Sequence, residues 1–161
     1  MAEQLDEVDV AVAAFREEGF WTVQELDPDD LDDAVALTEA LQRLPGDAGA
    51  IGMVAVDEDW FLLVRVAGDR VRLMLSDATA ADAWDLAASA LEELGLPEPE
   101  EDDEQAPAGD LDLLSDLGVT GMDLTVLVDD FDLLPDEILS DVARRLGFGP
   151  LFDEAVGASP A

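Results

Sequence analysis

The chain has 161 residues, of which 49% are hydrophobic, and its 41 acidic and 7 basic residues give a formal net charge of −34. The hydrophobic content is typical of a globular protein, which indicates one domain or one domain with a small appendage. Because nucleic acids and anionic membranes are bound through cations, this charge disfavours direct contact with either and favours a basic protein partner. An acidity that serves only solubility is the alternative interpretation.

Cysteine, histidine, lysine and tyrosine are all absent from the chain. Their absence excludes disulfides, thiolate and imidazole metal ligands, Ser-His-Asp triads and Schiff-base chemistry. The sequence also contains no phosphate-binding glycine loop and no serine-nucleophile elbow. We therefore expect a protein that is not an enzyme, with no catalytic residues, no cofactor and no metal.

The amino-terminal segment is acidic and lacks the basic start and apolar stretch of a secretory signal. The most clearly apolar run covers residues 60–64, far fewer than the roughly 20 residues that span a bilayer. We expect a cytoplasmic location and no membrane partner.

Hydrophobic periodicity predicts the element order β-β-α-β-β-β-α in the first 94 residues. Residues 16–19 form the expected turn of the first hairpin, and the loop Gly68-Asp69 joins the last two strands. Antiparallel hairpins with helices on one face indicate an α+β fold, a two-layer sandwich. The predicted elements are a hairpin at 8–25, a helix at 27–44, strands at 51–56, 60–67 and 70–75, and a helix at 80–94.

The remainder of the chain divides into an acidic, proline-rich linker at 95–108 and a C-terminal helical unit at 109–157. Short helices are expected at 111–117, at 121–131 and from Pro135 to about Leu146. About 50 residues seldom form a large core alone, so this unit is expected to dock on the sandwich domain at 8–94.

Acidic clusters such as Asp57-Glu58-Asp59 and Asp129-Asp130-Asp132 fit no EF-hand loop. In so acidic a chain they are interpreted as solvated faces and helix caps. Paired catalytic carboxylates need a geometry that a sequence does not show. A carboxylate or hard-metal enzyme is therefore the least favoured alternative.

Alternation along 60–67 and 70–75 brings three of the seven arginines to one sheet face, opposite the face assigned to the core. Such a face is open to three interpretations: a solvated surface, a surface covered by the linker or the C-terminal helices, or a contact for an external acidic or aromatic partner. We name it the arginine face and take it as the candidate partner-binding site. Its residues are Phe61, Leu63, Arg65, Arg70, Arg72 and Met74.

Several segments also match the sequence pattern of one known family. They include FREEGFW at 15–21, FLLVRVAGDRVR at 61–72 and LLPDE at 133–137. Together they resemble the actinobacterial tRNA adenosine deaminase-associated proteins, over nearly the whole chain. The resemblance implies association with a tRNA adenosine deaminase and supplies no catalytic residues. The deaminase itself needs histidine and cysteine zinc ligands, which this chain lacks.

The sequence thus favours a non-catalytic accessory or adaptor protein that acts through protein–protein contacts, with a tRNA adenosine deaminase as the partner that the resemblance implies. The alternative is an acidic mimic of nucleic acid, or a regulatory protein that binds a basic partner. We expect no direct binding of nucleic acid.

Overall fold

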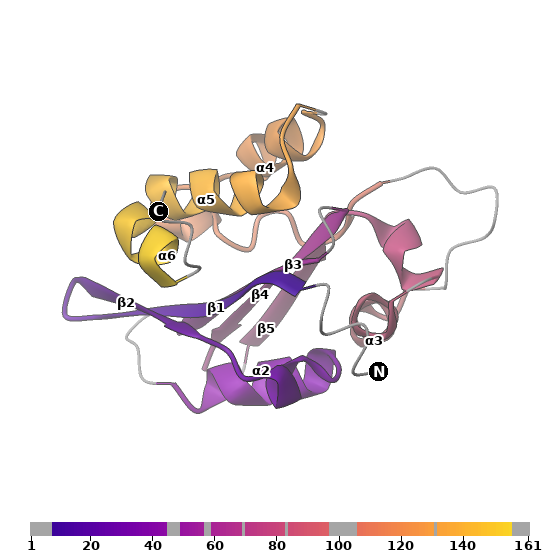
Figure 1. Cartoon of the computed structure of the whole chain (residues 1–161), viewed down its shortest axis with the longest axis horizontal. Helices are drawn as coiled ribbons and strands as arrows, with labels where there is room; N and C mark the ends of the chain where they lie inside the picture. Colours follow the sequence, from indigo (N-terminus) through magenta and orange to yellow (C-terminus); the bar gives the residue numbers. More distant parts are fainter. Residues whose placement is uncertain are drawn as a thin grey trace.

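A computed structural model describes residues 8–44, 49–56, 59–68, 70–82, 84–96, 106–130 and 132–155. They form three layers, with a six-stranded antiparallel sheet between two groups of helices (Figure 1). The α+β class and the predicted order of strands and helices are confirmed. The sheet has the order β2-β1-β3-β4-β5-β6, with β1 Val8–Glu17, β2 Phe20–Glu25, β3 Ala50–Val56, β4 Trp60–Ala67, β5 Arg70–Leu75 and β6 Ala108–Gly109.

The first hairpin turns more tightly than predicted. Glu17 pairs with Phe20, so the turn consists of Glu18 and Gly19 alone. Both have positive φ, 51° and 85°, the combination that a two-residue turn requires to follow the twist of its strands. In the second hairpin, Arg65 pairs with Arg72 as expected. Asp69 of its predicted loop lies outside the described residues.

One face of the sheet is covered by α2 Ala34–Gln42 and α3 Asp85–Leu94. Each helix is shorter than predicted and follows a separate 3-10 turn, Pro28–Leu31 or Ala78–Asp82. The cause is the choice of cap: the Asp33 carboxylate accepts the Ala36 N–H at 2.8 Å and starts α2 there. Near α3, Asp77 caps the backbone of Thr79 at 2.9 Å.

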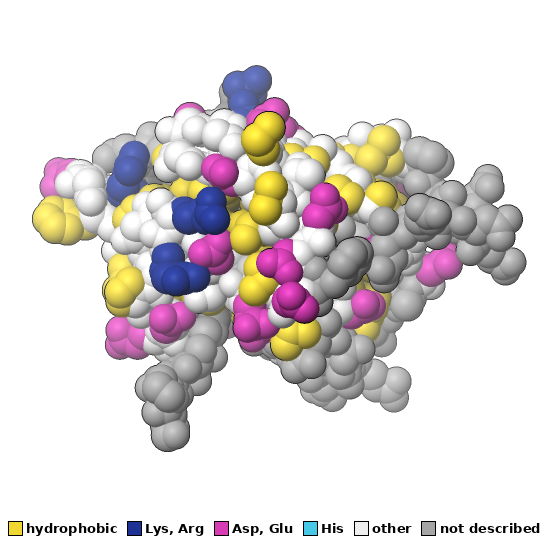
Figure 2. Space-filling view, turned by 90° about the horizontal axis from the view of Figure 1, so that it is seen from above, with side chains coloured by type: hydrophobic (Ala, Val, Ile, Leu, Met, Phe, Trp, Pro, Cys, Tyr) yellow, Lys and Arg dark blue, Asp and Glu magenta, His cyan; other side chains and the backbone are white. Residues whose placement is uncertain are grey.

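The opposite face is covered by α4 Gly121–Val128, α5 Pro135–Leu146 and α6 Gly149–Ala155, the face seen in Figure 2. The C-terminal unit therefore docks on the sheet as expected, and it adds a third layer to the two predicted. The predicted helix at 111–117 is instead a series of turns that ends in a 3-10 turn, Ser115–Leu117. The shared core of this side includes Phe61, Met74, Leu139, Val142 and Phe148.

The end of the predicted linker joins the sheet. Ala108 and Gly109 pair with Leu75 and Met74, and the Asp110 N–H donates to the Leu73 carbonyl at 2.9 Å. Residues 97–105, the greater part of the linker, lie outside the described residues. The division into two domains and a linker stays a prediction.

None of the helices in the described ranges combines the length and the apolar character needed to cross a membrane. The longest, α5, has 12 residues and carries charged side chains in its first and last turns. A helix needs about 20 apolar residues to span the hydrocarbon layer.

Candidate partner-binding site

The C-terminal helices cover most of the arginine face. Phe61, Leu63 and Met74 are at most 1% exposed, and Arg65 is 5% exposed. Only Arg70 remains exposed, with Arg72 half-buried beside it. Of the three interpretations of this face, cover by the C-terminal helices is the one that these four buried residues support. An accessible contact is confined to Arg70 and Arg72.

The buried Arg65 connects the sheet to the C-terminal unit. Its two terminal nitrogens donate to both carboxylate oxygens of Asp116, with Nη2 and Oδ2 3.0 Å apart, and Nη1 also donates to the Leu113 carbonyl at 3.0 Å. This two-point geometry is the strongest that a guanidinium and a carboxylate form. The hydrogen bond from Arg65 lowers the pKa of Asp116 below its usual value of 3.8, against an opposing desolvation effect. Arg65 is therefore a structural residue that fixes the segment at 111–117.

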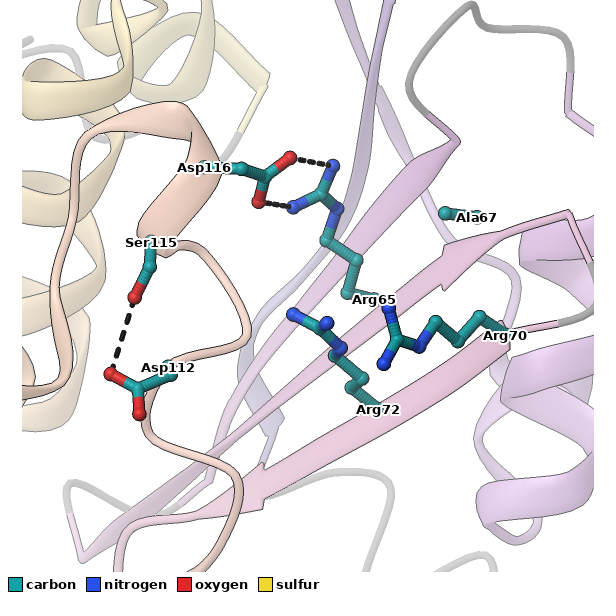
Figure 3. A pocket seen from close by; sticks show the side chains of 7 residues that line it. All are labelled: Arg65, Ala67, Arg70, Arg72, Asp112, Ser115 and Asp116. Carbon is teal, nitrogen blue, oxygen red and sulfur yellow. Dashed lines mark hydrogen bonds and ion pairs between the residues drawn. The ribbon is translucent and has the colours of Figure 1, made fainter.

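A pocket of about 510 Å³ opens beside this pair (Figure 3). The side chains of Arg70 and Arg72 both extend from β5 into it, with their guanidinium groups close together. Arg72 is held by Asp110, whose Oδ2 lies 3.6 Å from Nε. Within the described ranges, Arg70 has neither an ion pair nor a hydrogen bond. The residues that line the pocket are Arg65, Ala67, Arg70, Arg72, Asp112, Ser115 and Asp116.

The acidic wall of this pocket is engaged in local contacts. Asp112 accepts hydrogen bonds from the Ser115 hydroxyl at 3.2 Å and from the Gly121 N–H at 3.0 Å. Asp116 forms an ion pair with Arg65, and Asp110 forms one with Arg72. The guanidinium of Arg70 is thus the cation of the pocket that has no counterion among the described residues. A guanidinium group binds the oxygens of a carboxylate or a phosphate in two-point geometry.

Asp112, Ser115 and Asp116 were not predicted as part of this site. Asp116 is 51 residues from Arg65, and periodicity along a strand says nothing about such distant contacts. One signal was available: Arg65 interrupts an otherwise apolar strand, and a buried charge needs a partner. This signal predicts a carboxylate in the covering segment without identifying which one.

Several acidic side chains accept hydrogen bonds from the nearby backbone where the structure describes them. Thr120 and Asp123 form a reciprocal capping box at the start of α4, and the Asp130 carboxylate accepts the Asp132 N–H at 3.0 Å. Hydrogen bonds from Thr120 lower the pKa of Asp123. Among the described residues, no group of three or more acidic side chains is placed to hold a metal ion. Asp57 and Glu58 lie outside those residues.

The fold and the site define a strongly acidic α+β protein whose central sheet is covered on both faces. The model of the Rv3753c-like tRNA adenosine deaminase-associated protein family matches residues 9–149, and the chain belongs to this family. The chain is 41% identical over 140 residues to Protein Rv3753c of Mycobacterium tuberculosis, which covers 85% of this chain and 81% of that protein. The resemblance found in the sequence is confirmed. No solved structure matches the chain.

Proposed function

We propose that this protein is a non-catalytic accessory protein that associates with a tRNA adenosine deaminase through protein–protein contacts. The observation that carries the proposal is its family, whose description names this association. The deaminase reaction uses a zinc ion held by histidine and cysteine together with a glutamate. The chain contains no histidine and no cysteine, so the deaminase chemistry belongs to the partner.

Charge complementarity supports this choice of partner. An enzyme that binds tRNA presents cationic side chains to the phosphates. A chain with a net charge of −34 is attracted to such a surface at long range, and the attraction weakens as salt screens it. A cytoplasmic location is part of the proposal, since a tRNA-modifying partner is expected there.

The same charge supports a second candidate function, an acidic mimic of nucleic acid that occupies the tRNA-binding groove of its partner. The two functions differ in one observable. An accessory protein forms a ternary complex with the deaminase and tRNA, whereas a mimic is displaced by tRNA. A carboxylate or hard-metal enzyme remains the least favoured alternative, and a bound Mg²⁺ or Ca²⁺ detected by calorimetry would support it.

We place one contact of the partner at the pocket of Arg70 and Arg72, the accessible part of the arginine face. Arg72 has Asp110 as its counterion, whereas Arg70 has none among the described residues, so an anion at Arg70 would be attracted by an uncompensated guanidinium. A carboxylate of the partner fits this position better than a phosphate dianion does, because Asp110, Asp112 and Asp116 lie close by.

The experiment is a titration of the purified chain with the tRNA adenosine deaminase of the same organism at low and high salt. We expect binding that weakens as salt rises, and no interaction at micromolar concentrations would overturn the proposed function. Arg70→Glu is expected to weaken binding about tenfold, the loss of one charge-assisted contact. Arg43→Glu is the matched control, because Arg43 follows the last residue of α2, its side chain is 72% exposed, and it undergoes the same change of charge.

A further inference from the structure

The outer surface of α4 carries two large hydrophobic side chains that are exposed to solvent. Leu124 and Leu127 of this helix are buried against the core, whereas Met122 is 77% and Val126 is 63% exposed. Their spacing of four residues places them side by side along the helix. A single exposed hydrophobic residue is ordinary, but two adjacent ones in a chain of net charge −34 form a local apolar surface.

Two carboxylates follow at the end of this helix. Asp129 is the residue that caps the C-terminus of α4, and Asp130 comes directly after it, and both are exposed. Both line a pocket of about 270 Å³ where the α4–α5 connection meets the end of the sheet. The apolar part of this pocket includes Phe61, Leu133 and Ile138.

Four carboxylates line the pocket: Asp59, Asp77, Asp129 and Asp130. Among the described residues that line it, none is basic. All seven arginines are described by the structure, and none forms an ion pair with Asp77, Asp129 or Asp130. We name the surface formed by Met122, Val126, Asp129, Asp130 and this pocket the α4 surface.

The opposite end of α4 is electrostatically different. Asp123 lies 3.6 Å from Arg145, which is itself held by Asp141, so the carboxylate there has an internal partner. The uncompensated carboxylates are therefore confined to the C-terminal end of the helix. Figure 2 shows hydrophobic and acidic side chains next to each other on the face of the molecule that α4 to α6 form.

We infer that the α4 surface docks an amphipathic, basic segment of the deaminase, an inference that rests on the proposed function. The apolar side chains of that segment pack on Met122 and Val126, and an arginine or lysine side chain enters the pocket. The aliphatic stem of such a residue fits against Leu133 and Leu134, the accessible apolar side chains of the pocket, while its charged end meets Asp129 and Asp130. A second copy of this chain is a poor occupant, since two molecules of −34 repel each other.

The test uses the full chain and the purified deaminase in a calorimetric titration at two salt concentrations. Met122→Ser with Val126→Ser removes two apolar contacts and is expected to weaken binding about tenfold at both salt concentrations. Asp129→Asn with Asp130→Asn is expected to weaken binding about tenfold at low salt and to flatten the salt dependence. Circular dichroism checks that each variant keeps the fold, which is expected because the replaced side chains are exposed.

Matched controls separate the α4 surface from a general effect of charge or hydrophobicity. Asp29→Asn with Asp32→Asn changes the net charge by the same amount at exposed positions on the other side of the sheet. Phe20→Ser with Val35→Ser removes two side chains that are 78% and 45% exposed. Both controls are expected to stay within about threefold of the wild type, the scatter of ordinary surface substitutions.

Each outcome decides the inference. If the wild-type chain does not bind the deaminase, the proposed function fails and this inference fails with it. If the wild type binds and the two α4 variants bind equally well, the inference alone is overturned. Light scattering tests whether the chain associates with itself. Self-association that rises with concentration and is lost in Met122→Ser with Val126→Ser would identify a second copy of the chain as the occupant of the α4 surface, and would also overturn the inference.

Discussion

Arg65 and Asp116 join two segments that are 51 residues apart, and the two members of the pair lie in unlike surroundings. The side chain of Arg65 is 6% exposed, whereas that of Asp116 is 60% exposed. The carboxylate can therefore return to water if its partner is lost, but the guanidinium cannot. The two halves of this pair are expected to contribute differently to stability.

Replacing Asp116 by alanine leaves a buried guanidinium without its carboxylate. We expect Asp116→Ala to lower the free energy of unfolding by about 2–3 kcal/mol, measured by urea denaturation. Arg65→Met removes the buried charge itself and fills the site with an apolar side chain, but the buried Leu113 carbonyl loses its hydrogen bond, so the cost is expected to be about 1–2 kcal/mol, smaller than that of Asp116→Ala. Equal costs for the two variants would contradict this account of the pair.

The stability that the pair contributes depends on pH. Because Arg65 lowers the pKa of Asp116 from 3.8, the unfolded chain binds more protons at this group than the folded chain does in the acidic range. The contribution is fully present above the unfolded value and is lost as the pH falls through the folded value. The difference in unfolding free energy between the wild type and Asp116→Ala is expected to shrink over this range. A difference that stays constant as the pH is lowered would contradict the shift.

Backbone conformation supplies a third prediction, at the start of β3. Gly49 has a φ of +85°, and a side chain there would collide with the Val66 carbonyl oxygen. Gly68 also has a positive φ, +62°, but nothing lies within 4 Å of the position of its missing side chain. Gly68→Ala is expected to cost about 1–2 kcal/mol from the left-handed conformation alone. Gly49→Ala is expected to cost at least about 1 kcal/mol more in urea denaturation, and a smaller cost than that of Gly68→Ala would contradict the clash.

The sequence predicted the strands well, because alternation of side chains is visible within each strand. It predicted two layers where the structure has three, because the helices that cover the second face of the sheet are distant in the sequence. Alternation correctly placed Phe61 and Arg65 on one face. It did not show that α5 lies over that face, although β4 is buried along nearly its whole length. A continuous apolar run of this kind is typical of a strand covered on both faces, and it was the available signal for the third layer. The helix starts differed for another reason: the run of aspartates at 27–33 offers several competing caps, and Asp33 is the one that α2 uses.

Removal of the C-terminal unit provides the last prediction, since it tests both the third layer and the division into domains. A chain that ends at residue 96 exposes Phe61, Leu63 and Met74, all buried in the full chain. Hydrogen exchange at the backbone amides of β4 is expected to rise, because the sheet loses the core that it shares with α5 and α6. Trp21 packs against Phe148 with ring centroids 4.6 Å apart, so its fluorescence emission is expected to shift to the red. Trp60 and Trp84 pack together on the other side of the sheet. Their fluorescence emission, measured in a variant with Trp21→Phe, serves as the internal control. Unchanged exchange in β4 would show that the sheet and its first two helices form a unit independent of the C-terminal helices.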